Sequence, residues 1–451
     1  MSLLDLSDEE LLTLVSHSED PSSIVSSTDL NALLRRHRPV SDGPSVFPQK
    51  ILELVLKHFS LLSRKEETMA ILCSYISDCP IGVADTACNI VVGMCQQDLR
   101  LVHTFMQHCS SLQVTAEIAC RFASVITRLM RENDVAFVSC LNAGGVEFVV
   151  SLSKTDDILL QMVTLEFLAV FAMTKEGLKY SFTHDIPRYL LRLASGEETG
   201  SEVFIRSSAL QIFADTCRFG GLHDSGAVLL SVLEESLIDG FLRALQFNLE
   251  ESDESCRVAG INAASSFSSS SVALFGRVLG HAAVVRSWLS LVNAKVEIQA
   301  VLLTSLAFLL SHKFLATDER SKGAEIELKR QLFNELSATK SQFVQLIVSG
   351  ALRPFPEIKQ ACYSFQAAMA GTSWGLSLLL GYPGFREHLT DLGLEQTRDG
   401  KLWKFAVVEA AAGNESLGLL SEEFAAELTR AVARGPFYVS PQLVGPVTID
   451  R

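Results

Sequence analysis

Apolar and polar positions alternate with helical periodicity through the middle of the chain, and the pattern occurs twice in succession. Residues 145–173 form a short apolar segment, a polar turn and a longer apolar segment, and the same order returns over residues 185–217. Leu193 then aligns with Leu152 at a spacing of 41 residues. Apolar positions three and four residues apart predict amphipathic helices. Helical units that recur at about 40–47 residues are typical of armadillo and HEAT proteins.

The longer segments share a finer register: an apolar residue, then Gln, Arg or Lys, two free positions, and a small or apolar residue. Its first position falls at Ile118 (a looser copy), Leu160, Ile205, Cys256, Ile298 and Ile358. The successive spacings are 42, 45, 51, 42 and 60 residues. Such units cannot bury their apolar faces alone, so neighbours must stack. The sequence therefore predicts an all-α fold, an armadillo/HEAT-like α-solenoid in the form of a superhelical stack.

Three segments are predicted along the chain. Residues 1–47 are expected to hold short helices and Ser/Pro-rich linkers, and residues 48–434 the solenoid, with an insertion at about 318–350 that explains the longest spacing. Residues 435–451 are expected to form an extended tail, because their three prolines prevent a helix. Within the solenoid, the serine run 265–271 is expected to break a helix, since serine side chains compete for backbone hydrogen bonds.

Composition narrows the class of protein. Apolar residues make up 48% of the chain and mean hydropathy is +0.26, which suits helices buried on two sides. The richest apolar window, Ile158 to Met173, contains Glu166 and is shorter than a membrane span, so no transmembrane helix is expected. The acidic start at residues 1–10 does not resemble a signal peptide. We therefore expect a protein of the cytoplasm, and also of the nucleus, whose ten cysteines are reduced.

Charge excludes one class of partner. The chain has 38 Lys and Arg against 52 Asp and Glu, a net charge of −14. An acidic surface repels phosphate backbones, so a basic protein surface is a better partner than nucleic acid.

Catalytic motifs are missing from the sequence. It contains no GxxxxGK[ST], GxGxxG or HExxH pattern. His103 and His108 are five residues apart, which places them on different faces of a helix and argues against a metal site. Ser151 and Lys154 match an SxxK spacing without its companion motifs. We expect no enzyme activity, no cofactor and no metal.

The candidate site is a helix flank. At about 100° per residue, the sixth and tenth positions after each register start share a flank roughly 120° from the core centre. These positions are Ser124 and Arg128, Glu166 and Val170, Gln211 and Asp215, Asn262 and Ser266, Thr304 and Phe308, and Ser364 and Ala368. In armadillo-like stacks this flank lines the concave groove. The hypothesis is a polar, partly acidic groove that receives a partner's helix or domain; an ordinary solvated flank is the alternative.

Short segments near the end of the chain carry a family resemblance. Pro354–Ala361, Trp374, Pro383–Leu389 and Gly435–Pro441, in this order, resemble the 26S proteasome non-ATPase regulatory subunit 5 family. Residues 80–350 agree in period and register, and residues 1–45 depart from the family pattern. The resemblance implies a non-catalytic chaperone that holds the C-terminal domain of a proteasomal AAA+ ATPase subunit in the concave side of the solenoid. It also implies that docking of this domain onto the 20S core is blocked before assembly is complete.

The resemblance supplies no contact residues, so the flank positions are a separate inference. Other base subunits and assembly chaperones are further partners that it implies, and the free chain is expected to be a monomer. A generic armadillo adaptor, either a transport receptor or a kinase or phosphatase scaffold, is the alternative. Receptors of basic peptides line their groove with Trp and Asn ladders, whereas here the flank has only Asn262. The three tryptophans, Trp288, Trp374 and Trp403, lie elsewhere.

Overall fold

The computed structural model describes residues 34, 52, 65–111, 115–196, 202–315, 319–391, 395–414, 416 and 422–437. Within these ranges every regular element is a helix and no strand occurs. The chain divides into two units, residues 1–187 and 188–451. Apart from residue 34, the segment predicted for residues 1–47 lies outside the described ranges, as does the tail beyond Phe437. The predicted domain boundaries stay predictions.

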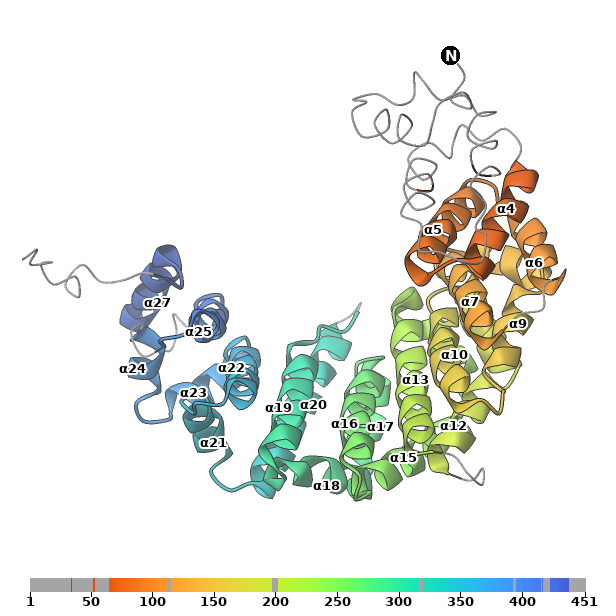
Figure 1. Cartoon of the computed structure of the whole chain (residues 1–451). Helices are drawn as coiled ribbons and strands as arrows, with labels where there is room; N and C mark the ends of the chain where they lie inside the picture. Colours follow the sequence, from red (N-terminus) through yellow and green to blue (C-terminus); the bar gives the residue numbers. More distant parts are fainter. Residues whose placement is uncertain are drawn as a thin grey trace, which may run out of the picture. The chain divides into compact units, whose positions relative to one another are not determined.

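Unit 1 is a stack of helices. They are α4 (Lys65–Asp78), α5 (Ile81–Gln97), α6 (Leu101–Ser111), α7 (Ala116–Met130), α8 (Asp134–Asn142), α9 (Gly145–Leu152), α10 (Ile158–Phe171) and α11 (Lys175–Thr183), and α12 (Ile186–Ser195) begins at its end. The longer helices α5, α7 and α10 pack against one another in succession (Figure 1). Side chains cap the starts of α7 and α10: Thr115 accepts from the N–H of Ile118, and Asp157 accepts from the N–H of Leu160.

Unit 2 repeats the arrangement. Its helices are α13 (Val203–Gly221), η4 (His223–Gly226), α14 (Ala227–Val232), α15 (Glu235–Glu250), α16 (Glu254–Ser268), α17 (Val272–Gly280), α18 (Ala282–Ser290), η5 (Leu291–Asn293), α19 (Val296–Ser311), α20 (Glu319–Thr339), α21 (Phe343–Gly350), α22 (Pro356–Ala370), α23 (Ser373–Leu380), α24 (Phe385–Thr390), α25 (Arg398–Ala412) and α27 (Glu422–Arg434). Helices α13, α16, α19, α22 and α25 pack side by side in this order (Figure 1). The prediction of an all-α fold of armadillo/HEAT-like repeats is confirmed.

From α8 onward the repeats contain three helices, where the sequence pattern predicted pairs, whereas α6 and α7 form a pair. The additional helices are short: α8 precedes α9 and α10, and α11 precedes α12 and α13. Helix α11 has nine residues, and Thr174 caps it by accepting from the N–H of Gly177. Three helices per unit are the armadillo form of this architecture. A nine-residue helix covers too few turns to show a clear apolar period, and the sequence pattern therefore missed it.

The region predicted as an insertion contains helices α20 and α21. They precede α22 as α17 and α18 precede α19. Helix α20 has 21 residues, whereas α17 has nine. The longest repeat spacing therefore reflects a long first helix in that repeat.

The polar position of the register has a structural role. Carbonyl groups at the end of a helix have no partner within that helix. The register side chain donates to such a carbonyl in the preceding element: Gln161 Nε2 to Ser153 O (3.3 Å), Gln299 Nε2 to Val292 O (2.6 Å), and Arg257 Nε to Glu251 O (2.6 Å). In the looser copy, Arg121 Nη1 donates to the carbonyls of Ile76 and Cys79 at the end of α4. The register side chain therefore fixes α10, α16 and α19 to the element before each of them, and α7 to α4. Arg206 and Lys359 instead pair with Glu251 and Glu395, which lie farther along the chain.

The predicted break at the serine run is only partly correct. Helix α16 continues through Ser268, and α17 starts at Val272 with Ser271 as its cap. Ser265 is buried, and its hydroxyl donates to the carbonyl of Ser305 on α19 at 2.8 Å. A serine that bonds to a neighbouring helix does not compete for the hydrogen bonds of its own helix. The first half of the run therefore joins two repeats.

A buried ionic cluster lies in the last part of unit 2. Glu395, which is 3% exposed, accepts from Lys359 Nζ at 3.0 Å and from the Tyr363 hydroxyl at 2.7 Å. The His388 ring is stacked on Tyr363 at 6.0 Å between centroids. Neither ring nitrogen of His388 has a hydrogen-bond partner within the described part of the chain. Lys404 is 1% exposed and donates to the carbonyl of Asp391. Charged groups therefore help to join α22, α24 and α25.

No single described helix is long and apolar enough to cross a membrane. Two pairs of consecutive helices together reach the length and hydropathy of a membrane span, but each pair is bent at a short break. The pairs are Asp134–Asn142 with Gly145–Leu152, bent by 79°, and Val272–Gly280 with Ala282–Asn293, bent by 86°.

Candidate protein-interaction site

In unit 1 the predicted flank residues lie on α7 and α10. Ser124 and Arg128 are half-buried on α7, and Glu166 is exposed on α10. The two helices pack against each other. Among the described residues, no hydrogen bond or ion pair engages the Glu166 carboxylate. Glu166 is therefore a free negative charge on this surface.

In unit 2 the structure brings three predicted residues together across α13 and α16. Gln211 Nε2 lies 3.0 Å from Asp215 Oδ2 and 3.4 Å from Ser266 Oγ, so the amide links the two helices. Asp215 Oδ1 also lies 3.3 Å from Arg218 Nε. The expected negative charge of Asp215 is therefore partly neutralised within its own helix.

Arg218 was not identified from the sequence as the partner of Asp215, although its spacing from Asp215 indicated it. It follows Asp215 by three residues, a spacing that places opposite charges together on a helix surface.

The flank continues on α16 and α19 with residues that face solvent. Asn262 and Thr304 are exposed, and Phe308 is 43% exposed. Beneath them, the Ser305 hydroxyl donates to the carbonyl of Ile261 at 3.2 Å and holds α19 against α16. An exposed aromatic ring beside hydroxyl and amide groups suits recognition of a protein surface, because aromatic anchors dominate binding energy in interfaces.

On α22 the flank positions are less exposed to solvent than on α16 and α19. Ser364 is half-buried and Ala368 is 7% exposed. The solvent-facing part of the flank in unit 2 therefore belongs to α16 and α19.

The groups considered for chemistry serve local structure. His103 Nε2 lies 3.0 Å from Gln107 Nε2, and the Ser151 hydroxyl bonds to the carbonyl of Phe148 in its own helix. Burial raises the pKa of the Cys95 and Cys217 thiols, so both stay protonated near neutral pH. Within the described ranges, no group of three or more His, Cys, Asp or Glu side chains is placed to hold a metal ion.

Comparison with known proteins gives a match to the C-terminal part of the chain. A family model described as "Proteasome non-ATPase 26S subunit" matches residues 284–447. The 26S proteasome non-ATPase regulatory subunit 5 of Homo sapiens is 26% identical over 150 residues, which cover 33% of this chain and 28% of the human protein. The resemblance inferred from the C-terminal segments is confirmed.

Solved structures with related helix arrangements have low similarity. She4p aligns with 94% of this chain and 56% of its own length at 13% identity and a TM-score of 0.45. UNC-45 from Drosophila melanogaster aligns with 90% of this chain and 56% of its own length at 14% identity and a TM-score of 0.39. Because both TM-scores are below 0.5, the fold assignment rests on the helices themselves.

Proposed function

We propose that the chain is a non-catalytic assembly chaperone for the base of the 26S proteasome regulatory particle. It holds the C-terminal domain of one AAA+ ATPase subunit and blocks premature docking of that domain onto the 20S core. The observation that carries the proposal is the match of residues 284–447 to the proteasome non-ATPase subunit family. The proposal places the protein in the cytoplasm and the nucleus, as a monomer when free, with other base subunits and assembly chaperones as further partners.

The flank residues support this function through their chemistry. Glu166 offers a free carboxylate, Asn262 and Thr304 offer exposed polar groups, and Phe308 offers an apolar anchor. These groups suit contact with a folded domain that presents basic and polar groups, and the net charge of −14 favours its approach. The flank requires no cofactor.

Reversal of charge on the flank tests its role. We expect Glu166→Lys to weaken binding of the partner domain by about fivefold, because an attractive contact becomes repulsive. The measurement is the Kd of the purified chain for the isolated C-terminal domain of each proteasomal ATPase subunit. Glu132→Lys is the matched control, since Glu132 is also exposed in unit 1 and lies off the flank.

Each outcome of this assay is informative. Selective binding of one domain that Glu166→Lys weakens and Glu132→Lys does not would support both the function and the flank. If Glu166→Lys and Glu132→Lys bind the ATPase domain with equal affinity, the contact surface does not include Glu166. If no ATPase domain binds, the chaperone proposal fails and a generic armadillo adaptor becomes the leading function.

Removal of the exposed aromatic anchor tests the other half of the flank. We expect Phe308→Ala to raise the Kd for the same domain about tenfold or more, because a buried aromatic contact at an interface is lost. Phe355→Ala is the control, since Phe355 is 57% exposed and lies off the flank. A thermal unfolding curve close to that of the parent chain would show that the loss is one of binding. Unchanged affinity would remove α19 from the site.

A further inference from the structure

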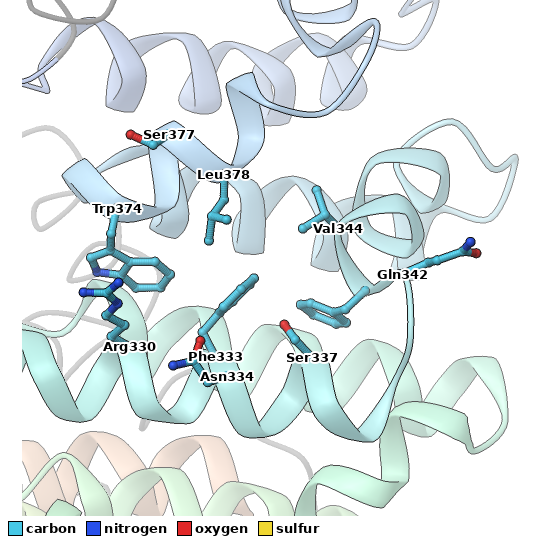
Figure 2. A pocket seen from close by; sticks show the side chains of 10 residues that line it. Arg330, Phe333, Asn334, Ser337, Gln342, Val344, Trp374, Ser377 and Leu378 are labelled. Atoms are coloured by element: carbon cyan, nitrogen blue, oxygen red, sulfur yellow. The ribbon is translucent and has the colours of Figure 1, made fainter.

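A pocket with an aromatic floor lies between α20, α21 and α23 in unit 2 (Figure 2). Its volume is about 690 Å³, and its lining residues are Arg330, Phe333, Asn334, Ser337, Gln342, Phe343, Val344, Trp374, Ser377 and Leu378. It contains none of the predicted flank residues. The pocket is therefore a second, separate surface of unit 2.

The floor of the pocket is rigid and apolar. Phe333 and Phe343 are 5% and 2% exposed and meet edge to face, with centroids 6.0 Å apart. Phe343 packs in turn against Phe365 of α22 at 5.2 Å. Trp374 is half-buried and lies 5.3 Å from the Phe333 ring. Leu378 is 43% exposed and points toward the space above this floor (Figure 2). A bulky apolar side chain placed there would bury its surface without rearranging the repeat.

One end of the pocket carries an unpaired positive charge. The exposed Arg330 side chain lies beside the Trp374 indole, as Figure 2 shows. Among the residues that the structure describes, no hydrogen bond or ion pair engages the Arg330 guanidinium, and no acceptor is found for the indole N–H of Trp374. None of the described residues that line the pocket carries a carboxylate, although the chain as a whole has a net charge of −14. The unpaired donors are suited to bind a carboxylate.

We propose that this pocket is a docking site for a segment of a partner protein that carries a bulky apolar side chain within one helical turn of an Asp or Glu. The apolar side chain lies over Phe333 and Trp374, and the carboxylate binds Arg330. The planar guanidinium can bind both oxygens of a carboxylate, which suits an Asp or Glu side chain within a continuous segment. The proposal does not depend on which partner the flank binds.

The test is selection from a library of random peptides about a dozen residues long, displayed without a free C-terminus, against the full-length chain. We expect enriched peptides to combine Leu, Phe, Trp or Met with a nearby Asp or Glu. Their affinity should fall about fivefold with Arg330→Glu and about tenfold or more with Trp374→Ala. Replacing the peptide's acidic residue with Lys should restore part of the binding to Arg330→Glu.

Two further variants keep the test decisive. Leu378→Glu places a negative charge on the exposed rim without disturbing the buried floor, so it should weaken binding even if Trp374→Ala fails to fold. Arg286→Glu is the matched control, because Arg286 is exposed on α18, away from the pocket, and should leave the affinity unchanged.

Several results would overturn the proposal. They are enrichment of peptides that lack acidic residues, or affinity that is unchanged in both Arg330→Glu and Leu378→Glu. Enrichment only from a library with free C-termini would assign the site to a terminal carboxylate instead. Competition by a peptide of residues 438–451 would make this chain's own tail the occupant. Self-association of the parent chain that Arg330→Glu abolishes would make a second copy the occupant.

Discussion

Replacing Glu395 with alanine should lower the free energy of unfolding by about 3–5 kcal/mol, because the change leaves a buried charge without its partner. Lys359 Nζ lies 3.0 Å from Glu395 Oε2, and their side chains are 17% and 3% exposed. The Tyr363 hydroxyl would lose its acceptor as well. Equilibrium unfolding in urea, followed by the loss of helical circular dichroism, measures the change.

A double variant separates two effects on the free energy of unfolding: the destabilisation caused by an unpaired buried charge, and the stabilisation that the intact ion pair provides. Replacing both charged groups with apolar ones, as in Lys359→Met with Glu395→Leu, should be less destabilising than Glu395→Ala, since no unpaired buried charge remains. Glu409→Ala is the control, because Glu409 is exposed on α25. A loss below about 1 kcal/mol for Glu395→Ala, the range of an exposed ion pair, would show that the cluster is solvated in solution.

The repeat pattern predicted the long helices well, because they share the same register of an apolar, a polar and a small or apolar residue. Helix α10 spans Ile158–Phe171 and α13 spans Val203–Gly221, so they end close to residues 173 and 217, where the two longer apolar segments were predicted to end. The short helix α11 was missed, since nine residues show little periodicity. The break inside the serine run was misplaced, because the partner of Ser265 is on another helix, 40 residues away in the sequence. Contacts of that kind are not visible in a local pattern.

For the candidate site, helical geometry predicted which residues share a flank but not which of them are free. Asn262, Thr304 and Phe308 are exposed, as their positions on the flank suggested. Asp215 is paired with Arg218, and this depends on side-chain placement. The pocket at Trp374 could not be predicted, because its floor joins helices α20 and α23, whose contact is set by tertiary packing.

Acid should destabilise the chain through His388. Burial, and then the nearby Lys404, lower the pKa of His388 to about 4, from an ordinary value near 6.5. Between these two pH values the unfolded chain binds a proton that the folded chain does not, so stability falls as pH decreases from about 6.5 to about 4. Across this pH range the free energy of unfolding falls by about 3 kcal/mol. Asp391 and Glu395 act in the opposite direction on the His388 pKa, but burial outweighs them.

The variant His388→Phe should remove this acid dependence while it keeps the ring stacked on Tyr363. At about pH 7 its stability should match or slightly exceed that of the parent chain, because two buried ring nitrogens without partners are replaced by carbon. At about pH 4.5 it should be more stable than the parent chain by about 2–3 kcal/mol. Urea midpoints measured across this pH range compare the two proteins. Parallel pH profiles for His388→Phe and the parent chain would mean that His388 is hydrated in solution.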